Sequence, residues 1–200
     1  MIRVGITGGI GSGKSTCCRL FAERGAAVYD CDRAAKRLMQ EDPALRQALT
    51  ERFGAEVYTA EGALNRSYLA AIVFGDGAAL ADLNGMVHPA VKADFARWCG
   101  EHAGEDYVVL ESAILFESGF DAAVDRTVAV TAPERLRIER TCSRDGASPE
   151  AVRARMAAQW PDDRLVERAD YCVVNISMEE LAADVDRLDK LFRHEAACRL

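Results

Sequence analysis

The feature that most limits how this chain can fold is a glycine-rich stretch near its amino terminus. Residues 8–15 read Gly-Gly-Ile-Gly-Ser-Gly-Lys-Ser, a complete G-x-x-x-x-G-K-S motif, and an apolar run at residues 2–7 comes directly before it. Glycines let the backbone turn its N–H groups inward around phosphate oxygens, and a helix that starts at the motif directs its positive end at the same anion. The motif therefore predicts a buried strand, a phosphate-binding loop (P-loop) and a helix, in that order.

The residue types in the motif predict a nucleoside triphosphate site with a metal ion. Lys14 supplies a positive charge for the β- and γ-phosphates, and the hydroxyl of Ser15 is a typical Mg²⁺ ligand. The alternative is a glycine-rich turn with a chance Lys-Ser pair, which the strand before it and the helix after it disfavour. We expect ATP and Mg²⁺ as cofactors, with ATP contacts from Gly8, Gly9, Gly11, Ser12, Gly13, Lys14, Ser15 and Thr16.

Five short apolar runs alternate with helical patterns, which predicts an α/β fold around a five-stranded parallel sheet. In such sheets ligands bind beyond the carboxyl ends of the strands, where Thr7, Asp30 and Glu111 are expected, so we predict a substrate contact from Thr7. We also expect the second strand to lie next to the first. The predicted strands are residues 2–7, 26–30, 107–111, 127–130 and 171–174.

Two stretches with helical signals interrupt this alternation. Residues 43–104 contain helix starts at Asp42-Pro43, Asn65 and Pro89, which is more helix than one crossover needs. Residues 143–168 are rich in Arg and contain Pro161. We predict a nucleotide-binding core (residues 1–42, 105–142 and 169–200), an inserted helical acceptor domain (43–104) and a helical lid (143–168).

Composition limits the partners and the compartment. With 25 basic and 32 acidic side chains the formal net charge is −7, which argues against a broad nucleic-acid surface. The seven cysteines show no Cys-x-x-Cys spacing and suit a reducing compartment. No apolar run approaches the roughly 20 residues of a membrane span. We expect a cytoplasmic protein with a small-molecule partner, without nucleic acid or membrane partners, and favour a monomer.

The class of P-loop protein follows from what else the chain contains. A GTPase needs a guanine-reading Asn-Lys-x-Asp, which does not occur here, and a nucleic-acid motor needs a basic track. A small-molecule kinase needs a base for the acceptor hydroxyl and cations that close over the transferred phosphate. Both are available, so the residues favour a kinase.

Two acidic residues follow the second predicted strand. Asp30 and Asp32 are candidates for the base that takes the proton of an attacking hydroxyl, and we favour Asp32. Asp30 is then left to orient the strand end or to bind a Mg²⁺-coordinated water. The alternative is that both only cap the helix that starts near Arg33.

Further charged residues complete the candidate site. Arg137, Arg140 and Arg144 recur at helical spacing, which fits either a solvated surface or a lid that delivers guanidinium groups, with Arg140 and Arg144 preferred as catalytic residues. Glu111 is expected to lie near Mg²⁺, although it is equally placed to cap the segment from Ser112.

Together these residues resemble the dephospho-coenzyme A kinase family over nearly the whole chain. The resemblance rests on the segments Val4–Ser15, Tyr29–Asp32, Asn65-Arg66, Val73-Phe74, Leu83-Asn84, His88-Pro89, Ile114–Glu117, Arg144–Gly146, Arg155, Gln159 and Ala169–Asn175.

The resemblance implies transfer of phosphate from ATP to the ribose 3′-hydroxyl of dephospho-coenzyme A. It implies Asp32 as the base, the helical insertion as the acceptor domain, and Arg66 and His88 near the acceptor. Two other functions remain open. One is a kinase for a nucleoside monophosphate or a sugar acid, and the other is a non-enzymatic, nucleotide-gated interaction protein.

Overall fold

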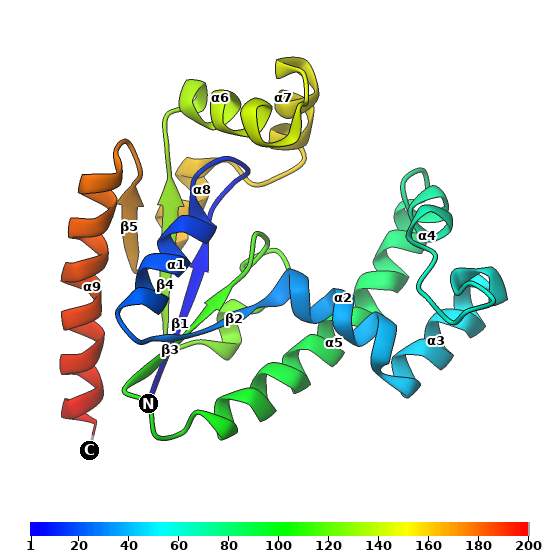
Figure 1. Cartoon of the computed structure of the whole chain (residues 1–200), viewed down its shortest axis with the longest axis horizontal. Coiled ribbons are helices and arrows are strands. Elements are labelled where there is room, and N and C mark those ends of the chain that lie inside the picture. The colour runs from blue at the N-terminus through cyan, green and yellow to red at the C-terminus, as the bar shows by residue number, and fades with distance from the viewer. Residues whose placement is uncertain (200) are drawn as a thin grey trace. The chain divides into compact units, whose positions relative to one another are not determined.

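The computed structural model describes residues 1–199 and divides the chain into two compact units (Figure 1). The first unit is made of residues 1–30 and of the chain from Glu101 onward, and it contains the sheet. The second unit, Cys31–Gly100, is helical. The sequence prediction grouped residues 31–42 with the core, whereas the contacts within the structure group them with the helical unit.

The first unit is built on a five-stranded sheet in which every neighbouring pair is parallel. The strand order is β2-β3-β1-β4-β5. The parallel α/β architecture is therefore as the sequence predicts. The strands are β1 (Ile2–Thr7), β2 (Ala27–Asp30), β3 (Tyr107–Glu111), β4 (Arg126–Thr131) and β5 (Tyr171–Val174).

The expectation that the second strand lies next to the first is wrong, because β3 lies between β1 and β2. The burial of the strands explains this order. Residues Tyr107 to Leu110 of β3 are all buried, as suits a strand covered on both faces, whereas Ala27 and Val28 of β2 are only half-buried, as suits an edge. The phosphate-binding loop therefore leaves the centre of the sheet, with β3 and β4 as neighbours.

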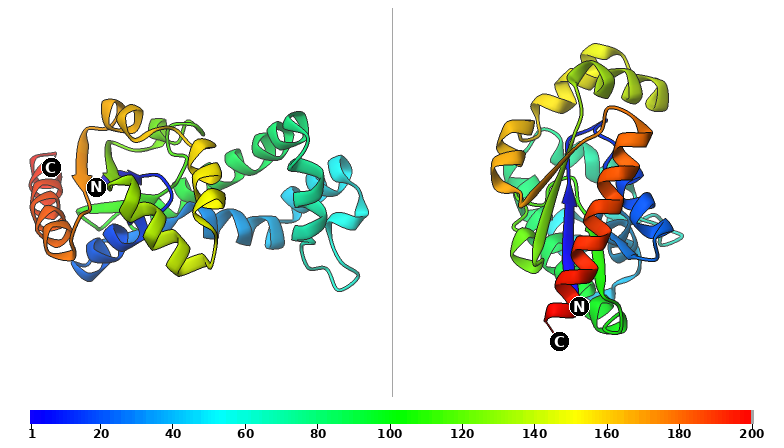
Figure 2. Two further views of the ribbon diagram at one scale, coloured as in Figure 1. Left: turned by 90° about the horizontal axis from the view of Figure 1, so that it is seen from above. Right: turned by 90° about the vertical axis from the view of Figure 1, so that its left-hand side faces the viewer.

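Helices cover both faces of this sheet. Helices α1 (Lys14–Glu23) and α9 (Met178–Cys198) pack against each other on one face, and α8 (Asp162–Arg168) lies against β4 on the other (Figure 2). The buried core between the sheet and α1 and α9 includes Ile6, Phe21, Val109, Leu181 and Phe192. Two more helices, α6 (Glu134–Asp145) and α7 (Pro149–Ala157), and the short η2 (Asp121–Ala123) complete this unit.

The second unit contains α2 (Cys31–Glu41), α3 (Pro43–Phe53), η1 (Ala55–Val57), α4 (Arg66–Val73) and α5 (Gly77–Glu101), whose last residue belongs to the first unit. The expected caps are present, since Asp42 Oδ1 accepts from the N–H of Leu45 and Asn65 Oδ1 from that of Tyr68. Asp94 on α5 is buried and accepts hydrogen bonds from Arg37 and Arg97. This buried carboxylate joins α2 to α5.

One helix boundary differs from the sequence prediction. Pro89 was expected to open a helix, but it lies inside α5, which begins at Gly77 and continues through it. The ring removes one backbone hydrogen bond, yet α5 buries Val87 and Val91 on either side of the proline, and this packing maintains the helix.

Among residues 1–199, no helix is long and apolar enough to cross a membrane.

Candidate active site

The phosphate-binding loop follows β1 and ends where α1 begins at Lys14. Gly13 caps this helix with φ 92°, a left-handed conformation that favours glycine. A Cβ atom there would collide with the side-chain amide of Asn175, which donates to the carbonyl of Ser12 over 2.8 Å. Glycine is therefore required at position 13 for two reasons, and Asn175 supports the loop from outside.

Lys14, Ser15 and Glu111 meet at the mouth of this loop. One carboxylate oxygen of Glu111 accepts hydrogen bonds from Lys14 Nζ at 2.7 Å and from Ser15 Oγ at 2.6 Å. The ion pair is largely buried, with side-chain exposures of 14% for Lys14 and 11% for Glu111. Burial alone would raise the pKa of Glu111, but the charge of Lys14 and these hydrogen bonds outweigh it, so the pKa of this carboxyl lies below its ordinary value. Glu111 is therefore ionised at neutral pH.

The register of the sheet places a second carboxylate beside Glu111, at the carboxyl ends of the strands. Asp30 is the residue paired with Glu111 across β2 and β3, and Glu111 is in turn paired with Ile6 of β1. Oxygen ligands of this kind suit Mg²⁺, which binds through one or two protein oxygens together with substrate phosphates and water. No group of three His, Cys, Asp or Glu side chains in the described part of the chain could hold a metal alone. The oxygens of Ser15 and Glu111 thus fit a metal that arrives with a nucleotide, and Asp30 is the next carboxylate along this row of the sheet.

The three arginines of α6 have different environments. The sequence favours Arg140 and Arg144 as catalytic residues, but Arg137 is the arginine that contacts the loop. Arg137 is buried, its Nε donates to the carbonyl of Ile10, and its Nη1 pairs with Asp162 at 2.6 Å. Arg140 donates to the carbonyls of Asn175 and Ile176, after β5. The exposed Arg144 pairs with Asp145.

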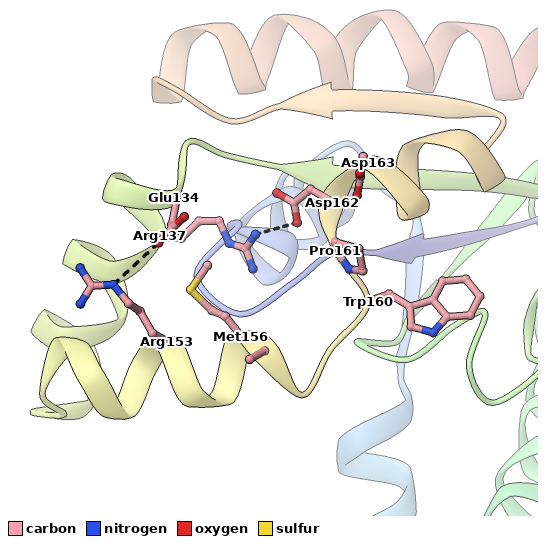
Figure 3. A pocket seen from close by; sticks show the side chains of 9 residues that line it. Glu134, Arg137, Arg153, Met156, Trp160, Pro161, Asp162 and Asp163 are labelled. Carbon is pink, nitrogen blue, oxygen red and sulfur yellow. Dashed lines mark hydrogen bonds and ion pairs between the residues drawn. The ribbon is translucent and has the colours of Figure 1, made fainter.

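A cavity of about 490 Å³ opens beside Arg137 (Figure 3). Arg137 points toward Asp162, while Arg153 on α7 points toward Glu134 on α6 (Figure 3). The lining of the cavity contains both carboxylates and guanidinium groups, so it carries charges of both signs. The cavity therefore does not select an anion by charge alone.

The remaining candidate residues differ in burial and in the unit to which they belong. Thr7 is fully buried, and its hydroxyl has no hydrogen-bond partner among the described residues. Thr16 is half-buried in the first turn of α1. Asp32 is exposed in the first turn of α2, in the second unit.

The second unit also contains Arg66 and His88. Arg66 is exposed at the start of α4. His88, on α5, is half-buried, and burial together with the charge of Lys92 lowers its pKa.

Two side chains that hold the loop are not marked by any local residue pattern. Gln159 accepts from the N–H of Ile10 at 2.8 Å, and Asn175 binds Ser12 as described above. Neither lies in a local motif, and only the family resemblance pointed to their segments.

A family model for dephospho-CoA kinase matches residues 2–180 of this chain. The chain belongs to the dephospho-CoA kinase family. A dephospho-CoA kinase of Porphyromonas gingivalis is 44% identical over 194 residues, covering 96% of this chain and 95% of the relative. One of Salinibacter ruber is 47% identical over 177 residues, covering 88% and 89%. Membership of a kinase family implies an enzyme that uses ATP.

Solved structures share the fold of this chain. TT1252 from Thermus thermophilus superposes with a TM-score of 0.79 at 34% identity, covering 97% of each chain. A dephospho-CoA kinase from Campylobacter jejuni gives a TM-score of 0.72 at 22% identity, covering 96% of this chain and 98% of its own. A shikimate kinase from Bacteroides thetaiotaomicron, at 15% identity and a TM-score of 0.58 over 95% of this chain and 97% of its own, shares the fold.

Proposed function

We propose that this protein transfers the γ-phosphoryl group of ATP to the ribose 3′-hydroxyl of dephospho-CoA, which yields CoA. The observation that carries the proposal is the convergence of Lys14, Ser15 and Glu111 at the phosphate-binding loop of a chain whose family is named for this acceptor. The loop binds and orients the triphosphate, and the family supplies the identity of the acceptor.

In this proposal the first unit stabilises the charge of the transferred group. Lys14 exchanges its contact with Glu111 for the phosphates, and the N–H groups at the start of α1 donate to phosphate oxygens. The oxygens of Ser15 and Glu111 would hold Mg²⁺, which would supply positive charge that neutralises the phosphates of the nucleotide. Arg140 and Arg144 supply positive charge from the lid (residues 143–168) and its preceding helix, and the lid excludes water that would otherwise compete with the acceptor.

The second unit supplies the acceptor site in this proposal. Asp32, exposed at the amino end of α2, takes the proton of the attacking hydroxyl, and Arg66 and His88 contact dephospho-CoA. Arg66 is suited to a phosphate because it is exposed and always charged. We further propose that the protein acts as a monomer in the cytoplasm.

The decisive experiment is a coupled assay of ADP release with dephospho-CoA, AMP and a sugar acid as competing acceptors. We expect turnover with dephospho-CoA to exceed turnover with either alternative by at least about 100-fold, and mass spectrometry to show CoA as the product. EDTA should abolish turnover, and added Mg²⁺ should restore it.

A control protein is needed because kinases of the host cell can contaminate the preparation and release ADP themselves. Lys14→Ala, purified in parallel, should lose about 100-fold or more of the activity. If it retains parent activity, the loop is not the site of transfer. A preference for AMP or the sugar acid would replace dephospho-CoA as acceptor, and nucleotide binding without acceptor-dependent ADP release would indicate a nucleotide-gated interaction protein.

A further inference from the structure

Ile10, the third residue of the phosphate-binding loop, has both of its backbone polar groups bound by distant side chains. Its N–H donates to Oε1 of Gln159 at 2.8 Å, and its carbonyl accepts from Nε of Arg137 at 2.9 Å. Gln159 lies between α7 and α8, and Arg137 lies on α6. Two elements from the second half of the chain therefore hold a single residue of the loop.

These two hydrogen bonds fix two successive peptide planes. All peptide bonds of the described residues are trans, so the N–H and C=O of each plane point in opposite directions. In the plane joining Gly9 to Ile10, the N–H meets Gln159 and the opposite carbonyl accepts from the N–H of Ser12 at 3.1 Å. This plane is held at both ends.

The next plane, between Ile10 and Gly11, is held at one end only. Its carbonyl meets Arg137, so the N–H of Gly11 is directed away from that guanidinium. The structure gives this N–H no acceptor among residues 1–199. A free loop N–H with a fixed direction is what a phosphate oxygen requires.

Arg137 is itself held in place. Its side chain is 8% exposed, and Nη1 pairs with Asp162, so the guanidinium is fixed between α8 and the loop (Figure 3). The backbone carbonyl of the same residue also lies where a Cβ on Gly11 would be, so α6 packs directly against the loop. The contact to Ile10 is therefore part of a rigid arrangement and is not a chance surface pairing.

We propose that Gln159 and Arg137 are positioning residues of the phosphate site, which fix the two peptide planes around Ile10 and so direct the Gly11 N–H toward the nucleotide's phosphates. This inference rests on the proposed function, because it concerns how the same loop binds ATP. It adds two residues whose effect is transmitted through the loop backbone.

The test measures ADP affinity by calorimetric titration of the full-length protein, together with the KM for each substrate. Gln159→Met is nearly isosteric and removes the acceptor of the Ile10 N–H without changing charge. We expect ADP to bind about tenfold more weakly, because losing the hydrogen bond from the Gly11 N–H to a phosphate costs about 1.4 kcal/mol. The KM for ATP should rise by a similar factor. The KM for dephospho-CoA and the thermal unfolding midpoint should stay at parent values.

A second variant and a control make the result specific. Arg137→Lys keeps the positive charge but loses the planar fork that reaches both Ile10 and Asp162, so it should weaken ADP binding in the same direction. The control is Gln47→Met on α3, an exposed glutamine that donates to Glu51 on the same helix, and it should leave both affinities unchanged.

Two outcomes would overturn the inference. One is an ADP affinity within twofold of the parent in folded Gln159→Met and Arg137→Lys proteins. The other is an equal weakening of ADP and dephospho-CoA, which would indicate a general loss of structure. If the parent protein binds ADP but shows no turnover with dephospho-CoA, the proposed function is wrong. The ADP titrations of Gln159→Met and Arg137→Lys would still test the positioning role of these two residues.

Discussion

At the scale of single residues, the ion pair between Lys14 and Glu111 sets the state of the site before a nucleotide arrives. Lys14 and Glu111, both largely buried, satisfy each other at 2.7 Å, and the lowered pKa of Glu111 keeps its carboxylate charged at neutral pH. In the proposed function, nucleotide binding replaces Glu111 by the phosphates as the partner of Lys14, so the charge of Lys14 keeps a partner. Replacing only Lys14 or only Glu111 would leave the other as a largely buried charge without its ion-pair partner.

Asp32 allows a sharper prediction at this scale. Asp32→Asn keeps the size of the side chain but removes its basicity, so kcat should fall by about 10² to 10⁴-fold while ADP affinity changes less than about threefold. Steady-state kinetics and ADP titration measure the two effects separately. The control is Glu41→Gln, an exposed carboxylate in the last turn of the same helix, which should turn over at the parent rate. Parent-like turnover of Asp32→Asn would assign the base to another residue.

At the scale of elements, the strands were predictable and the strand order was not. Apolar runs such as Ile2–Thr7 and Tyr107–Glu111 predict buried strands with the bounds observed, because a strand covered on both faces leaves a continuous apolar pattern. Which strands pair depends on long-range packing. The contacts of Ile10 show the same limit, since Gln159 lies 149 residues away and no local pattern joins them.

Pro89 provides a test at the element scale. Proline inside a helix costs roughly 3 kcal/mol relative to alanine, so Pro89→Ala should raise the free energy of unfolding by about 1 to 3 kcal/mol, measured by urea denaturation. Pro43→Ala is the matched control, because Pro43 occupies the first turn of α3, where the missing N–H has no intrahelical partner to lose. It should give no comparable gain. A Pro89→Ala protein no more stable than the parent would show that α5 already compensates for the proline.

At the scale of the whole molecule, one carboxylate joins the two ends of the chain. Asp125 accepts from the backbone N–H and the guanidinium of Arg3 on β1, and also pairs with Arg199 after α9. Burial of Asp125 would raise its pKa, but these hydrogen bonds outweigh it and lower the pKa from 3.8 to about 2. The first and last elements of the sheet unit are thus tied through a single side chain.

Asp125 should contribute a stability that depends on pH. Because its pKa is lower in the folded protein than in the unfolded chain, the contribution is complete above about pH 4 and is lost as the pH falls toward 2. Asp125→Asn should therefore cost about 1 to 2 kcal/mol at pH 7, allowing for the partly exposed arginines, and less as the pH is lowered. Urea unfolding from pH 7 to about pH 2.5 measures the difference.

The control is Asp184→Asn, which breaks a surface pair with Arg187 on one helix. It should cost less than about 0.5 kcal/mol at every pH. A difference between parent and Asp125→Asn that does not shrink in acid would contradict the assigned pKa.

The position of the helical unit in the chain has a consequence for engineering. Because β2 and β3 are adjacent and parallel, residues 31–100 form most of the connection that returns from the carboxyl end of one strand to the amino end of the next. A tight hairpin cannot make that return, which needs a dozen or more residues. If this unit is exchanged for a shorter one, the new connection must still reach from the carboxyl end of β2 to the amino end of β3. Otherwise the edge strand β2 will detach from the sheet.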